Sequence, residues 1–561
     1  MERELTILCY FASDNPLAPL VISEIKAIKA AGFQENTSVL LYFDPMVKGA
    51  PAQLFDVNHK RRDEHGTSIG DGEDPFVRNM TEDELKGDAL GAAAATMKKP
   101  DAVNALDSLN SFIDFGLKER PAKNYILFLL GHGMIVANDA FLPDDAPVSA
   151  ITLKDLRAVC EKFNKADARL RLLALHSCSM SSVEVAYELR GQADYMLATQ
   201  GTVFINAFPY RQMLKKTLSQ VKRAKKPRNP QRTPPRPVDY DELANKLYFL
   251  CLHNFTDFLN AGYSCDLVLC SLDPAKLTRL KEPLAGLVSN LKEELTPGPG
   301  LVKDLVLLAH WDAQSFFSEN YTDLWDFCDC LARRCNSASA PNEALKTRLT
   351  NISTLCGEIK TALVSENRGA PNGIVRHADN GGTEFQFSHG LSIYFPWSRP
   401  LDDQRATIKA AQDDSVRRQT EAKAKTILDL YKEYDFNEEL KPHSWFSFLE
   451  KYFDETKRGA EADPPGNTFK EISDEFDLDE PVVKKAFNTA MEAFFEGVTL
   501  KKTPDLKKTP DVGTDCTCPS IKNYPTAHDK EKQERARFWI TPNALQAFLP
   551  EKKGQKREDE E

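Results

Sequence analysis

The chain has 561 residues, of which 42% are hydrophobic and 28% charged, so most of it can fold around a buried core. Its 83 acidic residues outnumber 72 basic residues and leave a net charge of −11, which argues against general binding to nucleic acids or membrane surfaces. No apolar run reaches the ~20 residues that a membrane helix needs. The first residues lack the apolar core and cleavage site of a signal peptide, so we expect a cytoplasmic protein.

The 12 cysteines are scattered along the chain and do not form the pattern of a disulfide framework. Two close pairs, Cys328/Cys330 and Cys516/Cys518, each lack a second pair at the spacing of a zinc site. We therefore predict no metal centre and no cofactor.

The first part of the chain alternates apolar, β-prone runs with stretches that have a helical pattern. Thr152 followed by Asp155 predicts a capped helix start. Residues 46–100 interrupt the alternation with a charged, glycine-containing excursion that has a short helix near its end. The alternation predicts an α/β fold with a mostly parallel sheet covered by helices on both faces. The predicted strands are residues 5–11, 38–43, 124–130, 170–175 and 195–199, and the predicted helices are residues 17–30, 105–118 and 183–190.

A basic segment then breaks the pattern. Residues 222–237 carry seven positive charges, five prolines and no acid. Because proline disfavours regular structure, we predict an exposed linker over residues 222–238. A solvated surface insertion, a proteolytic processing site and a docking segment are all compatible with this composition.

The second half is predicted to complete the core and then become helical. The domain organisation that follows is residues 1–221 as the first part of the core, 222–238 as the linker, 239–400 as the rest of the core, and 401–561 as a helical C-terminal region with a low-complexity tail. The predicted helices are residues 240–259, 273–295, 321–365, 401–455 and one or two short ones within 481–498, and the predicted strands are residues 267–271 and 389–396.

Two predicted strands end in residues that can carry chemistry. One strand runs into a Gly-His-Gly sequence that contains His132, and another runs into Cys178. If the two strands are neighbours in a parallel sheet, His132 and Cys178 face one crevice at its edge. An imidazole close to a cysteine favours the reactive thiolate. Taken singly, Cys178 also fits an inert core cysteine and His132 a turn residue; the joint pattern is rarer, makes a Cys/His dyad a candidate and leaves these alternatives open.

Several sequence blocks agree with one known family. The most specific begins at Cys178 and matches the pattern Cys-x-Met-x-x-x-Glu-x-Ala-Tyr-Glu-Leu as far as Leu189. This pattern resembles the clostripain family of cysteine peptidases, relatives of caspases and gingipains. The resemblance covers about residues 3–455, without clear counterparts for much of 46–100 and 222–237. The other matching blocks are residues 5–17, 124–133, 194–200, 208–210, 271–277, 323–327 and 390–396.

The resemblance implies a caspase-like three-layer α/β sandwich with a mostly parallel sheet, plus a helical C-terminal subdomain. It also implies that Cys178 attacks a peptide carbonyl, while His132 protonates the leaving amine and then helps to activate water. Backbone N–H groups of Gly133 and Cys178 would hold the oxyanion.

The chain departs from the family at two positions that we assign to the substrate pocket. His176 stands two residues before the nucleophile, where family members usually carry an acid that helps to select Arg or Lys at the cut. Asn206 lies in the loop where a second acid is expected. Neither side chain replaces a carboxylate as the partner of a basic group, so the usual preference is in doubt. For His176, a packed residue hydrogen-bonded to backbone is the alternative.

Activation also differs from the family pattern. Family zymogens are often cut after a basic residue between the His and Cys segments, but residues 134–153 contain no Lys or Arg. The basic linker is the alternative target, cut by an upstream activating protease. Some family members use calcium, which stays possible here although the sequence shows no calcium loop with spaced ligands.

The leading prediction is a latent cysteine endopeptidase that acts on protein substrates. A setting in bacterial, CRISPR-associated defence follows from family analogy alone. The alternative is a non-catalytic scaffold on the same fold, with the dyad unused. Protein substrates and the activating protease are the predicted partners, with no nucleic acid and no membrane.

Overall fold

Contacts within the chain divide it into two compact units. In the computed structural model, the first unit comprises residues 1–396, 400–452 and 512–519. Of the described residues, only 397, 399 and 453–456 lie in the second unit. The structure describes residues 3–13, 17–31, 36–43, 53–56, 104–133, 140–145, 148–225, 236–296, 300–316, 320–364, 373–397, 399–400 and 427–456.

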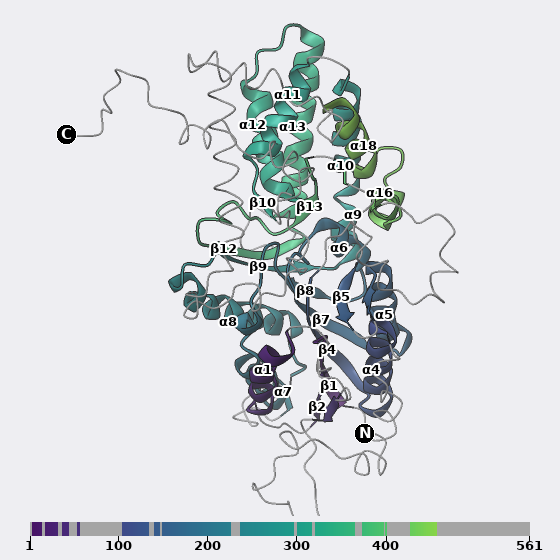
Figure 1. Ribbon diagram of the computed structural model, residues 1–561, viewed down its shortest axis with the longest axis vertical. Coiled ribbons are helices and arrows are strands. Elements are labelled where there is room, and N and C mark those ends of the chain that lie inside the picture. The colour runs from purple at the N-terminus through teal and green to yellow at the C-terminus, as the bar shows by residue number, and fades with distance from the viewer. Residues whose placement is uncertain are drawn as a thin grey trace, which may run out of the picture. The chain divides into compact units, whose positions relative to one another are not determined.

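A mixed sheet forms the centre of the first unit (Figure 1). Strands β8, β7, β4, β1 and β2 run parallel, whereas β3 at one edge and β9 next to β8 run in the opposite direction. The edge strand β12 pairs antiparallel with β9 and so runs in the same direction as the parallel strands. The central strands are buried on both faces, which explains their nearly continuous apolar sequences. The predicted α/β class with a mostly parallel sheet is confirmed. In sheet order the strands are β12 (Val375–Gly381), β9 (Cys265–Ser271), β8 (Tyr195–Ala198), β7 (Arg169–His176), β4 (Ala122–Leu130), β1 (Arg3–Phe11), β2 (Thr37–Phe43) and β3 (Gln53–Asp56).

Helices cover both faces of the sheet and complete the three predicted layers (Figure 1). On one face α1, α7 and α8 pack side by side, and on the other α4 packs against α5. Thr152 and Asp155 form the predicted capping box at the start of α5. The bounds are α1 (Ala18–Lys29), α4 (Ala105–Glu119), α5 (Leu153–Lys165), α7 (Tyr210–Lys225) and α8 (Tyr240–Asn260).

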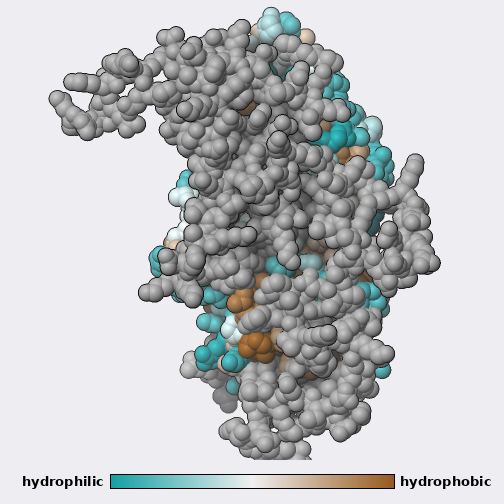
Figure 2. Space-filling view, in the orientation of Figure 1, coloured by the Kyte–Doolittle hydropathy of each residue, from teal (hydrophilic) through white to brown (hydrophobic). Residues whose placement is uncertain are grey.

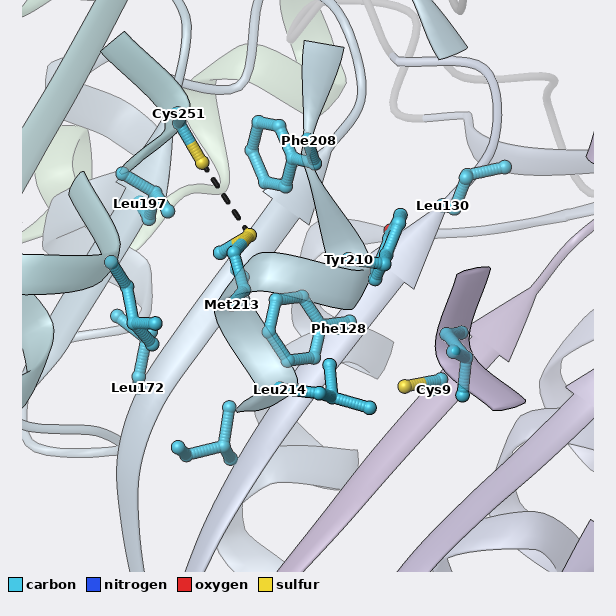
Figure 3. Packing of buried hydrophobic residues seen from close by; sticks show 14 of the residues in the cluster. Cys9, Phe128, Leu130, Leu172, Leu197, Phe208, Tyr210, Met213, Leu214 and Cys251 are labelled. Atoms are coloured by element: carbon cyan, nitrogen blue, oxygen red, sulfur yellow. Dashed lines mark hydrogen bonds between the residues drawn. The ribbon is translucent and has the colours of Figure 1, made fainter. Parts of the chain in front are cut away.

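The main hydrophobic core lies between the sheet and the α1, α7 and α8 layer. Alternate residues of each strand point into it, because successive strand side chains face opposite sides of a sheet. Figure 3 shows Phe128 of β4 and Leu172 of β7 facing Met213 of α7, whose sulfur lies 3.5 Å from the thiol of Cys251 in α8. Cys178 belongs to the same buried cluster.

A further group of helices packs together beyond the edge of the sheet (Figure 1). It lies within residues 239–400, so much of the helical structure precedes the C-terminal region to which we assigned a helical subdomain. A small antiparallel sheet with the order β10-β11-β13 accompanies these helices. The bounds are α9 (Pro274–Thr278), α10 (Lys281–Glu294), α11 (Leu301–Asp312), α12 (Leu324–Ser337), α13 (Glu343–Leu363), β10 (Ser315–Phe316), β11 (Tyr321–Asp323) and β13 (Ser392–Tyr394).

The small sheet corrects one predicted element. We predicted helix from residue 321, but Tyr321–Asp323 forms β11 and pairs with both β10 and β13. The helix begins only at Leu324, because the Asp323 side chain accepts a hydrogen bond from the Asp326 N–H at 2.8 Å and caps it. Pairing with distant strands therefore overrides the helical pattern of the following sequence.

Other elements were not predicted because they lack a strong local pattern. Strand β12 is mostly polar and lies at the sheet edge, so its sequence lacks the apolar run of a central strand. Helix α11, the hairpin of β5 (Phe141–Asp145) and β6 (Val148–Ile151), and β3 within the charged excursion were likewise missed. Helix α7 continues to Lys225, so regular structure persists into the basic segment before its first proline, Pro227.

Parts of several predictions lie outside the described residues. These are residues 46–52 and 57–100 of the excursion, residues 226–235 of the linker, residues 401–426 and everything after residue 456, including the predicted helices near 481–498 and the low-complexity tail. Within the described part of the C-terminal region, α16 (Ile427–Lys432), α17 (Asp435–Glu438) and α18 (Trp445–Thr456) are helical as predicted.

The C-terminal segment binds the short helix α6 (Val183–Glu188), which follows Cys178. Glu184 of α6 is fully buried, and its Oε1 accepts hydrogen bonds from the Tyr431 hydroxyl at 2.7 Å and the Tyr394 N–H at 2.9 Å. Burial raises the pKa of Glu184, which favours the neutral acid. Glu184, which belongs to the sequence block that begins at Cys178, thus links α16 and β13 to α6.

The other end of α6 makes polar contacts with α17. The Tyr187 hydroxyl donates to Glu439 at 2.6 Å, and Arg190 pairs with Glu439 at 2.5 Å. Arg157 of α5 pairs with Asp435. Residues that are more than 240 positions apart in the chain are thereby held together around α6.

On the face in Figure 2, hydrophobic atoms of described residues are concentrated in a small group in the lower half. Of the described helices, none combines the length and apolarity required to cross a bilayer.

Replacing Glu184 tests the attachment of the C-terminal segment. We expect Glu184→Ala to lower the free energy of unfolding by about 2–4 kcal/mol, because two buried donors lose their acceptor. Glu184→Gln keeps an acceptor oxygen and is expected to cost about 1 kcal/mol. Chemical denaturation measures both, with Glu358→Ala on the exposed face of α13 as the control. Equal stability of Glu184→Ala and Glu358→Ala would contradict the contact.

Candidate active site

Strands β4 and β7 lie side by side and run parallel, with Leu130 opposite His176 in the register. Both strands therefore end at the same edge of the sheet. His132 follows β4 by two residues, and Cys178 follows β7 by two residues. The prediction that these two strands are neighbours is confirmed. Because Leu130 lies opposite His176, the segments that contain His132 and Cys178 leave the sheet side by side.

Gly133 brings the two segments into direct backbone contact. A Cβ atom at Gly133 would overlap the carbonyl oxygen of Cys178 and lie 2.9 Å from its nitrogen. Only glycine allows this approach. A Cβ atom at Gly131 would likewise lie 2.6 Å from a methyl group of Leu142. The Leu142 N–H donates to the carbonyl of His132 at 3.2 Å, so strand β5 supports the histidine segment from the other side.

Cys178 sits in a sharp turn between β7 and α6. The next residue, Ser179, has φ +55, in the left-handed region that costs strain for a residue with a side chain. The Cys178 side chain is fully buried. The Val203 N–H donates to its Sγ at 3.3 Å, while the Val203 carbonyl lies 3.7 Å from the sulfur as an acceptor for the thiol. An N–H directed at sulfur favours the thiolate.

Residues 199–208, which we name the cover loop, contact the sulfur through Val203. This loop follows β8 and contains a short 3₁₀ turn, Ile205–Ala207. Its carbonyls accept hydrogen bonds from the nucleophile segment, from Ser179 N–H to Gly201 at 3.1 Å and from Ser181 N–H to Thr199 at 2.9 Å. The backbone around Cys178 is therefore positioned by the cover loop.

A buried polar network holds the first half of the cover loop. The carboxylate of Asp266 accepts hydrogen bonds from the N–H groups of Gln200 at 2.6 Å and Gly201 at 2.8 Å. The Gln200 side chain donates to Asp323 at 2.9 Å and accepts from the Gly390 N–H at 2.9 Å. Burial raises the pKa of Asp266 to about 7. Sequence reasoning missed this network, because its members lie on four separate segments and no local spacing connects them.

His176 does not face a surface that is open to substrate in this structure. Its ring is fully buried, and its Nε2 lies 2.7 Å from the Phe204 carbonyl while its Nδ1 lies 3.0 Å from the Tyr210 hydroxyl. Burial lowers its pKa to about 4, so the ring is neutral near pH 7. His176 is thus a packed residue hydrogen-bonded to backbone, as the alternative had it, and its role in a substrate pocket stays a prediction.

Asn206 lies in the cover loop with an exposed side chain. Its backbone carbonyl accepts a hydrogen bond from the Asn254 amide of α8 at 2.7 Å. His132 is half-buried, and Gly133 is buried beside Cys178. The structure thus brings His132, Gly133 and Cys178 together at one edge and places His176 and Asn206 on different sides of the cover loop.

The described residues contain no group of three or more His, Cys, Asp or Glu side chains arranged to hold a metal ion. Cys328 and Cys330 are buried in α12. The pair Cys516/Cys518 lies outside the described residues.

Comparison of the sequence with family models identifies the family. The sequence model of the clostripain family matches residues 9–439 of this chain. The chain belongs to the clostripain family. Its class is that of the cysteine peptidases, and both His132 and Cys178 lie within the matched residues. No curated protein sequence matches the chain significantly.

Solved structures of the same family are similar to the chain at low sequence identity. One is an inactive zymogen C11 protease from Parabacteroides distasonis, with 16% identity over 77% of this chain and 99% of that chain, at a TM-score of 0.42. Another is a secreted C11 cysteine protease from Bacteroides thetaiotaomicron in complex with an irreversible peptide inhibitor, with 14% identity over 73% of this chain and 99% of that chain, at a TM-score of 0.37.

The close approach at Gly133 gives a direct test of the site geometry. We expect Gly133→Ala to lower the free energy of unfolding by about 3 kcal/mol or more, because the added methyl group meets backbone that cannot move aside. Gly357→Ala is the matched control, since a Cβ atom there has open space in a helix and is expected to add up to about 1 kcal/mol of stability. Thermal and chemical denaturation measure the stability of both variants. If Gly133→Ala is as stable as the wild type, the close contact with Cys178 is ruled out.

Proposed function

We propose that this chain is a cysteine endopeptidase in which Cys178 is the nucleophile and His132 the general acid and base. The observation that carries the proposal is the shared edge of β4 and β7, where the backbone of Gly133 packs against that of Cys178. Acyl transfer to sulfur needs a thiol and a proton carrier at one place, together with backbone donors beside the reacting carbon.

The reaction proceeds in two displacement steps. The Cys178 thiolate attacks the carbonyl carbon of the scissile peptide, and the electron pair of the carbonyl moves to its oxygen. When the tetrahedral intermediate collapses, the C–N bond breaks and His132 protonates the leaving amine. Water then attacks the thioester and gives a proton to His132, and collapse breaks the C–S bond to release the carboxylic acid and the Cys178 thiolate beside a protonated His132.

The oxyanion is proposed to be held by the backbone N–H groups of Gly133 and Cys178. The two residues are in backbone contact, so donors from both can point to one position. Fixed backbone dipoles cost no reorganisation when the negative charge develops, which is why such donors lower the barrier.

We propose that the enzyme does not select Lys or Arg at the cut. Position 176 holds a buried neutral imidazole, and residues 199–210 contain no Asp or Glu. A guanidinium or ammonium group in a pocket formed by these residues would lack the carboxylate that stabilises it. Protein substrates are therefore cut after residues of another class.

We propose that the intact chain is latent. The Cys178 sulfur is fully buried beneath the cover loop, so a substrate carbonyl reaches it only after this loop moves. Residues 134–153 offer no basic residue for a cut between the two catalytic segments, whereas residues 222–237 offer seven. A companion protease that cuts in the basic segment is the proposed activator.

The burial of Cys178 also favours a second candidate function. In a scaffold protein on this fold, Cys178 would serve only as a core residue. Its place in the buried hydrophobic cluster is compatible with that role. The two candidates differ in whether any turnover depends on the thiol. A cytoplasmic location and a role in CRISPR-associated defence stay predictions from the sequence.

Cleavage of a proteome-derived peptide library tests the enzyme against the scaffold. We expect wild-type protein to cleave peptides, and Cys178→Ala and His132→Ala to lose at least about 10³-fold of the rate. Cys330→Ala, which removes a buried thiol in α12, is the control and is expected to retain activity. The assay is run with calcium and with a chelator, because calcium dependence remains open. Turnover that persists in Cys178→Ala would leave the scaffold as the surviving candidate.

Limited digestion with trypsin tests the latency. We expect a cut in residues 222–237 to raise peptide cleavage by about 10-fold or more, because the cut shifts the population towards an open cover loop. A variant with Gln at all seven basic positions of this segment is the control and is expected to remain at the basal rate. These positions are Lys222, Arg223, Lys225, Lys226, Arg228, Arg232 and Arg236. Full activity of this variant without trypsin would show that the intact chain needs no activation.

A further inference from the structure

The cover loop determines the surroundings of the Cys178 sulfur. It contacts the nucleophile segment through Gly201, Thr199 and Val203, and the last of these presents both its N–H and its carbonyl to Sγ. A small shift of Val203 would therefore change both the access to the thiol and the stabilisation of the thiolate. The contacts that hold the second half of the cover loop, after Val203, therefore affect both the access to Cys178 and the stability of its thiolate.

His176 is attached to the cover loop directly after Val203. A carbonyl oxygen can only accept a hydrogen bond, so the Nε2 of His176 carries the proton that is donated to the Phe204 carbonyl at 2.7 Å. The Nδ1 is then an acceptor, and the Tyr210 hydroxyl donates to it at 3.0 Å. The ring also stacks on Phe208, with centroids 4.3 Å apart and planes 9° from parallel.

These contacts make His176 the polar anchor of the second half of the loop. Phe204 and Phe208 lie four residues apart in the cover loop, and His176 contacts both. The first half has its own anchor in Asp266, which binds Gln200 and Gly201. Loss of the His176 contacts would therefore release Val203 while the loop stays attached at its other end.

We propose that His176 is a positioning residue that holds Val203 of the cover loop against the Cys178 sulfur, and that it does not contact substrate. The proposal rests on the function proposed for Cys178. It differs from the interpretation that His176 replaces a specificity-determining acid, because a packed ring with both nitrogens bonded inside the protein is not available to a substrate side chain. The neutral, desolvated state of the ring agrees with a structural donor.

The substitution His176→Asp separates the two interpretations. If the side chain at position 176 faces the substrate, a carboxylate there creates a preference for Lys or Arg at the cut. If His176 is a positioning residue, an ionised carboxylate has no proton to donate and repels the Phe204 carbonyl, so the cover loop loosens and no basic preference arises.

Alkylation of Cys178 by iodoacetamide, located by mass spectrometry in the full-length protein, reports on the loop independently of peptidase activity. We expect slow alkylation in the wild type and a rate at least about 10-fold higher in His176→Asp, which corresponds to the loss of one buried hydrogen bond. His176→Gln can still donate to the Phe204 carbonyl and is expected to stay within about 3-fold of wild type. His253→Gln, at an exposed position of α8, is the control.

Tyr210→Phe provides a milder perturbation in case His176→Asp unfolds. It removes only the hydroxyl that donates to Nδ1, and we expect alkylation of Cys178 to rise by about 2–5-fold. Global unfolding would instead expose Cys160 of α5 equally, so the ratio of Cys178 to Cys160 alkylation identifies the local effect.

The peptide library and the alkylation rates together decide the proposal. Faster alkylation of Cys178 in His176→Asp and in Tyr210→Phe, with no gain of Lys or Arg preference, supports it. Wild-type alkylation rates in both variants, or a new basic preference in His176→Asp, would overturn it. If Cys178→Ala retains full cleavage, the proposed function fails, whereas a failure confined to the alkylation rates concerns His176 alone.

Discussion

The structure depends on the close approach of two backbones at one edge of the sheet. Because β4 and β7 are adjacent and parallel, the segments that follow them leave the sheet together, and Gly133 lets the histidine segment touch the backbone of Cys178. A side chain at position 133 would separate them. The order of the strands brings His132 and Cys178, which are 46 positions apart, to the same edge of the sheet. The missing Cβ atom of Gly133 determines how closely the two segments approach.

Buried polar groups then arrange the surroundings of the sulfur. Asp266 and His176 each bind backbone of the cover loop, and Glu184 binds the segments that pack behind α6. Unpaired polar groups are costly in a protein interior, so each of these side chains restricts the loop or segment that satisfies it. The nucleophile segment is held in this way from the cover loop on one side and from the C-terminal segment on the other.

The surroundings of position 176 fit a histidine better than the acid that the family resemblance led us to expect there. An acid at position 176 would have to be buried next to a carbonyl oxygen, which is unfavourable for a charge. A histidine can donate from Nε2 to the Phe204 carbonyl and accept at Nδ1 from the Tyr210 hydroxyl, and both contacts are present. The histidine at this position thus goes together with an enclosed ring whose two nitrogens both have partners inside the protein.

The sequence by itself determined the α/β class, most strands of the central sheet, the capping box at Thr152 and the two residues Cys178 and His132 at neighbouring strand ends. These follow from local pattern, because apolar runs, caps and strand-terminal residues are visible in a short window. Only the tertiary structure decided that Tyr321–Asp323 is a strand, that His176 is enclosed and that Asp266 and Gln200 hold the cover loop. Those outcomes depend on hydrogen-bond partners from distant parts of the chain, and no local pattern specifies which distant groups will satisfy a buried donor or acceptor.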